Sequence, residues 1–400
     1  MSLPANPSPE GPIWQFEPNP RIEQPACSPD DLAQRLRAHA AGLGLVGLGF
    51  AAVEPFAQAE QAFRAWIDAG YQGTMDYMVS DGARSDPSRL AAKSTTMVVA
   101  GIATVPPANK GPSLSLLGQV AAYAKGADYH GILRQKLSAL GQLAADHSGH
   151  CVNGRACVDT APFLEREAAR RSGLGFIGKS NMLIVPGIGS QVLLGVLLVD
   201  IAISPDVPRE QRCGRCTACL TACPTQAFVR PWLLDARRCI AYLTIEYKGW
   251  IAHELRPLIG TRIFGCDVCQ DVCPFNHGKA EPNSNNTHDV PIRSETTHLS
   301  QWLRLSSSGY RRLTAGTAIR RASRWQLLRN AAVAAGNSAD ETLIAPLTAL
   351  LLESTYAIVR GHAAWALGRY RNPNAVRALT EALEHEVNAQ VVSEIESALE

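Results

Sequence analysis

Cysteine is the residue type whose spacing in this chain points most directly to chemistry. Eight of the eleven cysteines lie between positions 213 and 273. The first group, in the stretch CGRCTACLTACP, contains Cys213, Cys216, Cys219 and Cys223. The second group, in the stretch CDVCQDVCP, contains Cys266, Cys269 and Cys273, and Cys239 lies between the groups. In a chain expected to be cytosolic, thiols clustered in this way indicate a metal site rather than disulfides.

The spacing favours iron–sulfur clusters over zinc. A zinc site commonly takes two well-separated CxxC pairs, with four ligands for one ion. A CxxCxxCxxxCP run is instead typical of bacterial ferredoxins, in which three cysteines bind one cubane and the fourth binds the other. Position 263, where the same spacing would place a cysteine ahead of the second group, is isoleucine. Cys239 is available to take that place.

This ferredoxin rule predicts the ligands of two [4Fe–4S] clusters. One cluster is expected on Cys213, Cys216, Cys219 and Cys273, and the other on Cys223, Cys239, Cys266 and Cys269. The three remaining cysteines are interpreted as buried structural thiols: Cys27, Cys151 and Cys157. A free-standing ferredoxin is far shorter than 400 residues, so we expect the rest of the chain to hold a reaction centre, a partner surface, or both.

Composition describes a globular chain of two or three domains. Apolar residues make up 46% of the chain and charged residues 18%, and the net charge is +2. A nearly neutral chain can bind nucleic acid only through a local patch. The apolar run 182–199 contains Pro186 and Gly187, so we expect two buried strands and no membrane span. No signal peptide is visible, which predicts a cytoplasmic location.

The chain divides by composition into five expected segments. They are an extended Pro-rich arm (1–27), an α/β catalytic domain (28–205), a two-cluster domain (206–280), a polar linker (281–300) and an all-α domain (301–400). Within the α/β domain we expect a helix over 28–42, buried strands over 44–54 and 96–105, and a long helix over about 114–146.

The helical tail carries an internal repeat and a basic segment. LLRNAAVAAGN (327–337) and IVRGHAAWALG (358–368) align at an offset of 31 residues, which predicts HEAT-like helical pairs; an irregular bundle is the alternative. No acidic residue occurs between 301 and 338, where the arginines are Arg304, Arg311, Arg312, Arg320, Arg321, Arg324 and Arg329. Such an array favours a phosphate-binding surface, and a solvated basic face is the alternative.

Several stretches together resemble the epoxyqueuosine reductases, a family of cobalamin-dependent iron–sulfur enzymes that modify tRNA. The resemblance spans about 155–340 and is carried by CVDTAPFLEREAARRSGLGFIGKSNMLI, CGRCTACLTACPTQAF, CIAYLTIEYKGWI, ELRPLIGTRIFGCDVCQDVCPFN and LLRNAAVAAGN. It implies a cobalamin-binding α/β catalytic domain, a ferredoxin-like two-cluster domain and a HEAT-like tRNA-binding domain. The implied reaction is the last step of queuosine biosynthesis, in which Co(I) cobalamin reduces epoxyqueuosine to queuosine at the wobble position of tRNA.

The resemblance assigns the proton donor to Asp159, in the stretch CVDTAP. From the residues alone, Asp159 would be read as the start of a helix ahead of Pro162. A proton donor near neutral pH requires a raised pKa, so we expect burial or a nearby negative charge at Asp159. The cobalamin-binding pattern DxHxxG is absent, because DYHGIL (128–133) lacks its glycine. We therefore expect a base-off corrinoid with no histidine ligand from the protein, as the resemblance also implies.

The resemblance also implies cofactor and substrate contacts. Corrinoid contacts are expected at Arg84, Asp159, Lys179, Leu183, Leu194, Ala241, Phe264, Gly265 and Asp267. Contacts with tRNA are expected at Arg166, Tyr247, Lys248, Arg320, Arg321 and Arg324. The expected partners are a tRNA with a GUN anticodon carrying epoxyqueuosine and an electron donor of the flavodoxin, ferredoxin or flavin type. We expect a monomer that does not bind membranes.

Two other functions use the same features. A reductive dehalogenase also combines cobalamin with two cubanes, but usually carries a twin-arginine signal, and none is visible here. A non-catalytic electron-transfer subunit would need neither Asp159 nor a corrinoid. Bound corrinoid in the purified protein separates this last class from the two enzymes.

Overall fold

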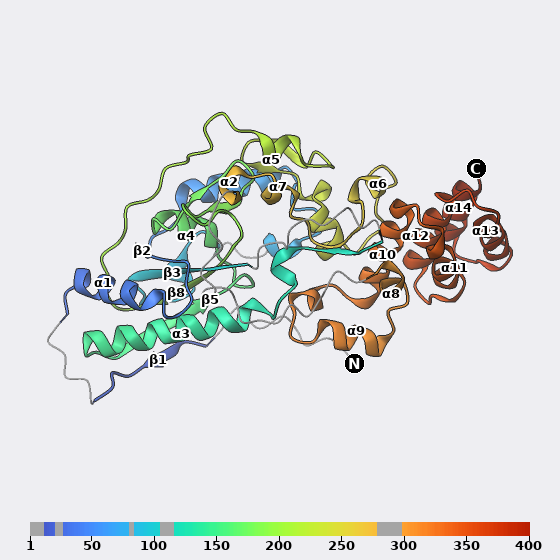
Figure 1. Cartoon of the computed structure of the whole chain (residues 1–400). Helices are drawn as coiled ribbons and strands as arrows, with labels where there is room; N and C mark the ends of the chain where they lie inside the picture. Colours follow the sequence, from blue (N-terminus) through green and yellow to red (C-terminus); the bar gives the residue numbers. More distant parts are fainter. Residues whose placement is uncertain (1–11, 21–26, 80–83, 105–115, 278–297) are drawn as a thin grey trace.

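The computed structural model describes residues 12–20, 27–79, 84–104, 116–277 and 298–400. Figure 1 shows an α/β part at one end, a stack of helices at the other, and the short helices of the cysteine-rich segment along the upper edge. Among the described residues, no helix is both long and apolar enough to span a lipid bilayer.

A five-stranded antiparallel sheet forms the α/β part. Its order is β1-β5-β8-β3-β2, with bounds Trp14–Phe16, Val152–Cys157, Val192–Val199, Thr96–Ala103 and Gly47–Ala52. The central strands β3 and β8 are buried along most of their length, because helices cover both faces. β1 lies within the segment expected to be an extended arm, and it forms one edge of this sheet.

Side chains alternate between the two faces of the sheet, as the period of a strand requires. Val98 and Ile102 pack with α1 (Pro29–Ala40) and α3 (Tyr129–Ser148) on one face. Met97 and Val99 pack with α4 (Glu165–Arg171) on the other. Smaller elements of this part are α2 (Ala57–Asp68), β6 (Phe176–Ile177), β7 (Leu183–Ile184) and the 3-10 helices η1 (Asp76–Met78), η2 (Pro87–Arg89) and η3 (Ala122–Ala124).

Most elements expected in this part are present, but the helix predicted over 114–146 is wrong in its first half. Strand β4 (Gln119–Val120) and η3 precede α3, which begins only at Tyr129. The Asp128 side chain accepts the backbone N–H of His130 and caps the helix there. β4 pairs in parallel with β11 (Arg262–Phe264) from the cysteine-rich segment, so a long-range contact overrides the local helical pattern.

The cysteine-rich segment consists of short elements. They are α5 (Ala218–Thr221), β9 (Phe228–Arg230), β10 (Leu233–Leu234), η4 (Ala236–Arg238), the π-helix η5 (Tyr242–Glu246), α6 (Arg256–Ile259), β11, α7 (Val268–Asp271) and η6 (Pro274–Asn276). α5 and α7, which carry cysteines of the two groups, lie against each other.

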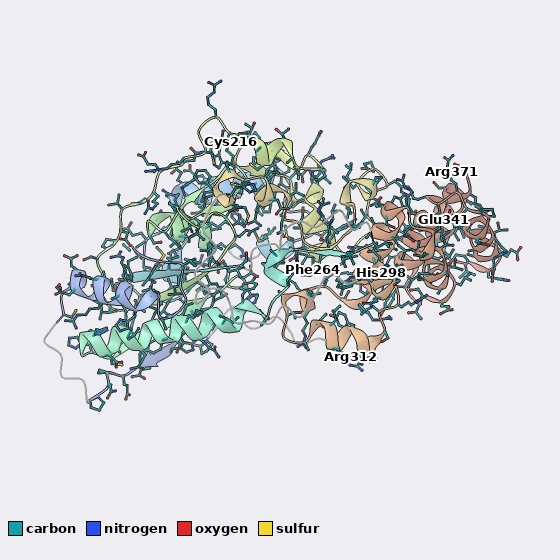
Figure 2. All side chains as sticks on the ribbon, viewed as in Figure 1. Cys216, Phe264, His298, Arg312, Glu341 and Arg371 are labelled. Carbon is teal, nitrogen blue, oxygen red and sulfur yellow. The ribbon has the colours of Figure 1, made fainter. Side chains whose placement is uncertain are left out.

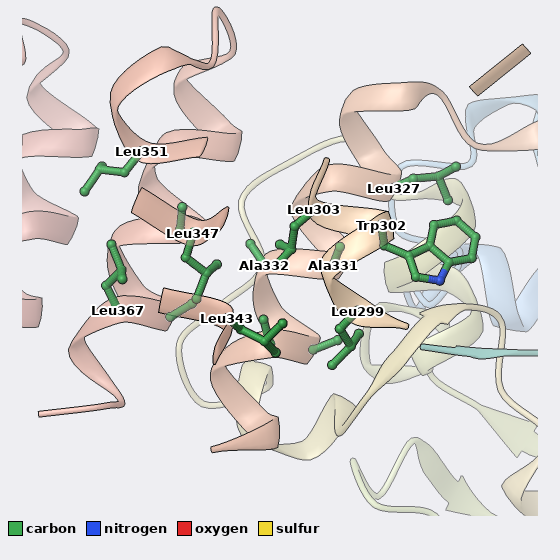
Figure 3. Close-up of a cluster of buried hydrophobic side chains, with 14 of the residues drawn as sticks. Leu299, Trp302, Leu303, Leu327, Ala331, Ala332, Leu343, Leu347, Leu351 and Leu367 are labelled. Carbon is green, nitrogen blue, oxygen red and sulfur yellow. The ribbon is translucent and has the colours of Figure 1, made fainter. Parts of the chain in front are cut away.

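The tail is helical throughout. Its elements are α8 (Leu299–Leu303), α9 (Ser307–Thr314), η7 (Ala318–Arg321), α10 (Arg324–Ser338), η8 (Glu341–Leu343), α11 (Ile344–Glu353), α12 (Ala357–Gly368), α13 (Pro373–His385) and α14 (Ala389–Leu399). The two aligned stretches fall in α10 and α12, which pack together. Figure 3 shows part of the core, where Trp302 and Leu327 lie near each other and Leu347 lies toward Leu367.

Helix α10 binds the backbone of the cysteine-rich segment through buried polar side chains. Arg329, which has no exposed surface, donates to the carbonyl oxygens of Leu243, Tyr247 and Gly249 at 2.6–2.9 Å. Asn330 donates to the carbonyl oxygens of Thr244 and Ile263, and Asn337 to those of Arg256 and Gly260. The sequence pattern grouped Arg329 with a phosphate-binding surface, and this is wrong, because its guanidinium serves the fold.

Candidate functional site

The predicted cluster ligands influence one another in two sets, although within the described residues no three His, Cys, Asp or Glu side chains lie close enough to bind a single metal ion. Burial, and then the neighbouring thiols of Cys213, Cys273 and Cys216, raises the pKa of the Cys219 thiol. Burial, and then the thiols of Cys239 and Cys266, raises the pKa of the Cys269 thiol. Burial raises the pKa of Cys239 as well, and the neighbouring Cys223 adds to this effect. Cys269 also lies close enough to Cys219 for the two groups to interact. These neighbours support the predicted ligand sets, whose assignment stays a prediction.

The surroundings of these thiols suit cluster ligands. The backbone N–H of Ala227 donates to Cys223 Sγ at 3.3 Å, and backbone N–H groups lower the pKa of Cys239 and Cys266 against the effect of burial. Hydrogen bonds of this kind to sulfur are one way in which a protein adjusts a cluster's reduction potential.

Asp159 lies in the loop that follows β5, where three parts of the chain meet. Its backbone has a φ of 48°, a left-handed conformation that Asp adopts more readily than most residues. Its Oδ2 accepts a hydrogen bond from Arg321 Nη1 at 2.6 Å and lies 3.5 Å from His130 Nε2. Its backbone N–H donates to Glu165 Oε1 at 2.5 Å. A carboxylate, an imidazole and a carboxyl group thus lie within reach of one another.

The charges around Asp159 oppose the expected raised pKa. Burial raises the pKa of Asp159, but the proximity of His130 and the charge of Arg321 outweigh it and hold the pKa well below its usual range. The expectation of a raised pKa at Asp159 is therefore wrong for this structure. The positive partners stabilise the carboxylate more than burial destabilises it.

Raised pKa values occur instead at the two neighbours of Asp159. Burial lowers the pKa of His130, but hydrogen bonding to Asp128 and Asp159 outweighs it and raises the pKa to about 9. Burial, and then the charge of Asp159, raises the pKa of Glu165 to about 8. At neutral pH both neighbours hold a proton while Asp159 is ionised.

Arg321 links Asp159 to the cysteine-rich segment. Its Nε lies 2.8 Å from Glu246 Oε1, at the end of the π-helix η5, while its Nη1 binds Asp159. Arg321 belongs to η7 of the helical tail, so one guanidinium joins all three parts of the chain. Sequence patterns grouped Arg321 with a phosphate-binding surface. They gave no signal for Glu246 as its partner, or for His130 and Glu165 as neighbours of Asp159.

Aromatic side chains surround this group of charges. Burial raises the pKa of Tyr77, Tyr123 and Tyr129, and each of these phenols also interacts with Asp159 and Arg321. Tyr129 stacks on His130 with ring centroids 4.3 Å apart, and Tyr123 lies against Phe264 at 6.2 Å. The site is therefore a charged centre with phenolic and apolar walls.

Three of the residues expected to contact a corrinoid lie around this centre. Arg84 donates to the carbonyl oxygen of Tyr77 at 2.7 Å. Phe264 is fully buried against Tyr123, and Asp267 accepts the N–H of Ala122 at 2.7 Å. Burial raises the pKa of Asp267.

The other expected corrinoid residues lie in the surrounding framework. Gly265 has a φ of 73° and donates its N–H to Thr244, while Ala241 precedes the π-helix. Leu183 and Leu194 are buried beside the sheet. Lys179 lies at the cysteine-rich loop, where its Nζ donates to the carbonyl oxygens of Gly214 and Cys216.

The residues expected to contact tRNA differ in accessibility. Arg166, Lys248, Arg320 and Arg321 are exposed, whereas Tyr247 and Arg324 are partly buried. Arg166 donates to the carbonyl oxygen of Asn181, and Arg324 donates to that of Leu305. The Tyr247 hydroxyl donates to the carbonyl oxygen of Trp250 at 3.1 Å.

Three family models match the chain in separate segments. "Epoxyqueuosine reductase QueG, DUF1730" matches residues 84–160, "4Fe-4S double cluster binding domain" matches 212–276, and "HEAT repeats" matches 313–400. They confirm the expected two-cluster and HEAT-like parts.

Whole-chain relatives agree with these matches. The epoxyqueuosine reductase of Escherichia coli (strain K12) is 39% identical over 350 residues, covering 85% of this chain and 90% of the relative. That of Pseudomonas aeruginosa is 38% identical, covering 86% of this chain and 95% of the relative.

A crystal structure of an epoxyqueuosine reductase with an epoxyqueuosine-modified tRNA-Tyr stem loop is 31% identical, with a TM-score of 0.84, covering 92% of this chain and 98% of that one. The Bacillus subtilis enzyme, solved with its catalytic aspartate loop swung out of the active site, has a TM-score of 0.82 at 31% identity and the same coverage. With its two-cluster domain and its helical tail, this chain belongs to the epoxyqueuosine reductase family of oxidoreductases.

Proposed function

We propose that this chain reduces epoxyqueuosine to queuosine at the wobble position of tRNA, with a corrinoid as reductant, two [4Fe–4S] clusters as electron supply and Asp159 as proton donor. The observation that carries this proposal is the position of Asp159. Its carboxylate lies between His130 and Arg321, where the α/β part, the cysteine-rich segment and the tail meet. The related structure with a modified tRNA stem loop supports tRNA as the substrate.

The residues around Asp159 fit a corrinoid without a protein histidine ligand. The imidazole of His130 beside Asp159 has Nδ1 2.6 Å from Asp128, and its buried Nε2 faces the Asp159 carboxylate at 3.5 Å without a hydrogen bond in the described residues. Aromatic and aliphatic walls suit a large macrocycle, and the residues proposed to hold it are Arg84, Lys179, Leu183, Leu194, Ala241, Phe264, Gly265 and Asp267. When bound in its Co(I) state, a corrinoid would supply two-electron reduction at carbon.

Converting an epoxide to an alkene and water consumes two electrons and two protons. His130 and Glu165 both hold protons at neutral pH and both lie next to Asp159. We propose that Asp159 delivers a proton to the departing oxygen and that His130 supplies this proton to Asp159. Because the resting pKa of Asp159 is low, its carboxylate can take that proton only when the ion pair with Arg321 is broken and the pKa rises.

Substrate binding is proposed on the tail and the adjoining loops. The contacts are proposed at Arg166, Tyr247, Lys248, Arg320, Arg321 and Arg324. Arg321 already binds Asp159 and Glu246, so a phosphate that drew it away would raise the pKa of Asp159. We infer the domain boundaries expected from the sequence at 28–205, 206–280 and 301–400, with β1 joining part of the 1–27 segment to the α/β domain; most of the linker expected over 281–300 lies outside the described residues. We also infer a monomeric cytoplasmic protein and an electron donor of the flavodoxin, ferredoxin or flavin type.

Anaerobic reconstitution with iron, sulfide and cobalamin tests the reaction directly. The loaded protein is incubated with a chemical reductant and with tRNA carrying epoxyqueuosine, and the nucleosides of the digested tRNA are separated by mass. The expected result is a nucleoside that has lost one oxygen atom, formed only when both cobalamin and reductant are present. A protein that binds cobalamin but leaves epoxyqueuosine intact in tRNA contradicts the proposal.

A further inference from the structure

One face of the cysteine-rich segment exposes a predicted cluster ligand to solvent. Cys216 is exposed, whereas the other predicted ligands are partly covered. Figure 2 shows Cys216 at the upper edge of the molecule, while Arg312 of the basic helix α9 lies at the lower edge. The surface around Cys216 is therefore separate from the arginine-rich surface of the tail.

Hydrogen bonds join the cysteine loop to the neighbouring β9–β10 hairpin. Lys179 donates through Nζ to the carbonyl oxygens of Gly214 and Cys216 at 2.7 and 2.9 Å. Trp232 donates its backbone N–H to the carbonyl oxygen of Lys179 at 3.0 Å, and its indole N–H to that of Ile177 at 3.2 Å. The cysteine loop and the β9–β10 hairpin thus form one surface with Lys179 beneath it.

The hairpin presents apolar side chains beside this loop. Trp232, with a φ of 62° at the turn, is 44% exposed, and Val229 is 53% exposed. An exposed indole whose N–H is already satisfied offers a rigid apolar contact for a partner protein. Trp232 and Val229, the loop 212–216 and Arg230 together make up what we call the Cys216 face.

The Cys216 face is positively charged. Between 207 and 234 the sequence contains four arginines and one acidic residue, Glu210. Arg212 and Arg215, which flank the predicted ligands, and Arg230 on the hairpin are all exposed. Within the described part of the chain, none of these three arginines forms an ion pair. Their charge is therefore available to a negatively charged partner.

We propose that the Cys216 face is the docking surface of an acidic one-electron carrier protein. Each encounter oxidises the carrier by one electron and reduces the adjacent cluster by one, so two encounters supply the two electrons of one turnover. Opposite charges accelerate such encounters, and small apolar contacts suffice because redox complexes are brief and bury little surface. The inference rests on the proposed function only for the destination of the electrons.

Transfer RNA is the other anionic macromolecule that a basic surface could bind. The observations favour a carrier protein, because the charge surrounds an exposed cluster ligand and an apolar indole. The arginine-rich segment that suits phosphate lies on the opposite edge in Figure 2. Binding of tRNA at the Cys216 face is therefore an outcome that the experiment must be able to reveal.

Stopped-flow reduction of the cluster-loaded full-length protein tests the docking surface. The probe is a reduced flavodoxin, an acidic carrier, and the signal is the visible absorbance of the clusters. In Arg212→Gln/Arg215→Gln we expect the second-order rate constant at low salt to fall about tenfold and its salt dependence to flatten. Reduction by dithionite, a small molecule, should be unchanged. The matched control, Arg371→Gln/Arg377→Gln, removes the same charge from exposed positions of the tail and should keep the wild-type rate with flavodoxin.

An unchanged flavodoxin rate in the double variant overturns the proposal, and so does a loss of tRNA affinity without a change in that rate. If the double variant binds less iron, Arg230→Glu on the hairpin gives the same test without altering the ligand loop. Because the readout is cluster reduction, the result is independent of turnover on tRNA. A protein that accepts electrons with this charge dependence but leaves epoxyqueuosine intact refutes the proposed function and not the docking surface.

Discussion

At the scale of single residues, the site is organised by one guanidinium and two proton-holding groups. Arg321 pairs with both Asp159 and Glu246, while His130 and Glu165 approach Asp159 from its other sides. With Arg321 in place, the resting carboxylate is ionised and the protons lie on its neighbours. The acid of the proposed reaction is therefore best described as a coupled group rather than as one aspartic acid.

The pKa of Glu165 leads to a prediction about stability and pH. Its folded-state pKa of about 8 lies above the ordinary 4.5, so its contribution to folding is fully present below pH 4.5 and is lost as pH rises through 8. Between pH 7 and 9 the deprotonation of Glu165 alone should lower the free energy of unfolding by about 1 kcal/mol. In Glu165→Gln that part of the fall should disappear, which urea denaturation at the two pH values measures. An equal fall in variant and wild type would show that Glu165 does not titrate in this range.

At the scale of elements, α10 connects the tail to the segment that carries Cys239 and the π-helix. Three of its side chains, Arg329, Asn330 and Asn337, donate hydrogen bonds to carbonyl oxygens of that segment. A buried ion pair, Arg256 with Glu394 at 2.6–2.7 Å, connects α6 to α14 in the same way. The helical tail therefore supports the two-cluster segment as well as carrying the arginines proposed to bind tRNA.

Replacing Arg329 by methionine should damage this connection. Methionine fills similar space but leaves the carbonyl oxygens of Leu243, Tyr247 and Gly249 without their donor in a buried position. The expected loss is about 3 kcal/mol in the free energy of unfolding, measured by urea denaturation. Arg312→Gln, an exposed change on α9, should stay within about 0.5 kcal/mol of wild type. A loss at Arg329 no larger than at Arg312 would contradict this structural role.

Elements with local signals could be predicted from the sequence, and those fixed by distant partners could not. Local residues specify the helix expected over 28–42 and the apolar runs of β3 and β8, and all three elements were predicted at nearly the right positions. The first half of the helix expected over 114–146 was wrong because β4 depends on β11. Arg321 and Asp159 are 162 residues apart in sequence, so no local pattern could pair them.

At the scale of the whole molecule, electrons are predicted to enter at the Cys216 face and to pass through the two clusters of the cysteine-rich segment to the site around Asp159. On the predicted assignment Cys239, distant in sequence from both cysteine groups, completes the cluster of Cys223, Cys266 and Cys269, and its thiol interacts with each of these three. Cys239→Ala should therefore remove one cluster and leave about four of about eight irons per chain. Iron and sulfide analysis after anaerobic reconstitution measures this. A variant that retains the full iron content would require a different eighth ligand.

The tail should bind tRNA through its exposed arginines. Arg312 and Arg320 are exposed and make no ion pair in the described residues, whereas the exposed Arg321 is held by Asp159 and Glu246, and Arg329 is buried. Arg312→Gln/Arg320→Gln should weaken tRNA binding and reduce the salt slope of log Kd by about one unit for each lost phosphate contact. The control Arg371→Gln/Arg377→Gln carries the same charge change on exposed positions farther along the tail. Equal affinity and equal slope in the two double variants would mean that α9 and η7 present only a solvated basic face.

The most direct test of the account compares wild type with Asp159→Asn in a single turnover on tRNA carrying epoxyqueuosine. Both proteins are loaded with clusters and cobalamin and reduced in advance, and queuosine formation is followed by mass analysis of the nucleosides. Asparagine keeps the shape of the side chain but cannot deliver a proton. The predicted result is unchanged cobalamin and tRNA binding with queuosine formation slower by about 10²–10⁴-fold. Conversion by Asp159→Asn at close to the wild-type rate would contradict the account and leave Asp159 only as the ion-pair partner of Arg321 and His130.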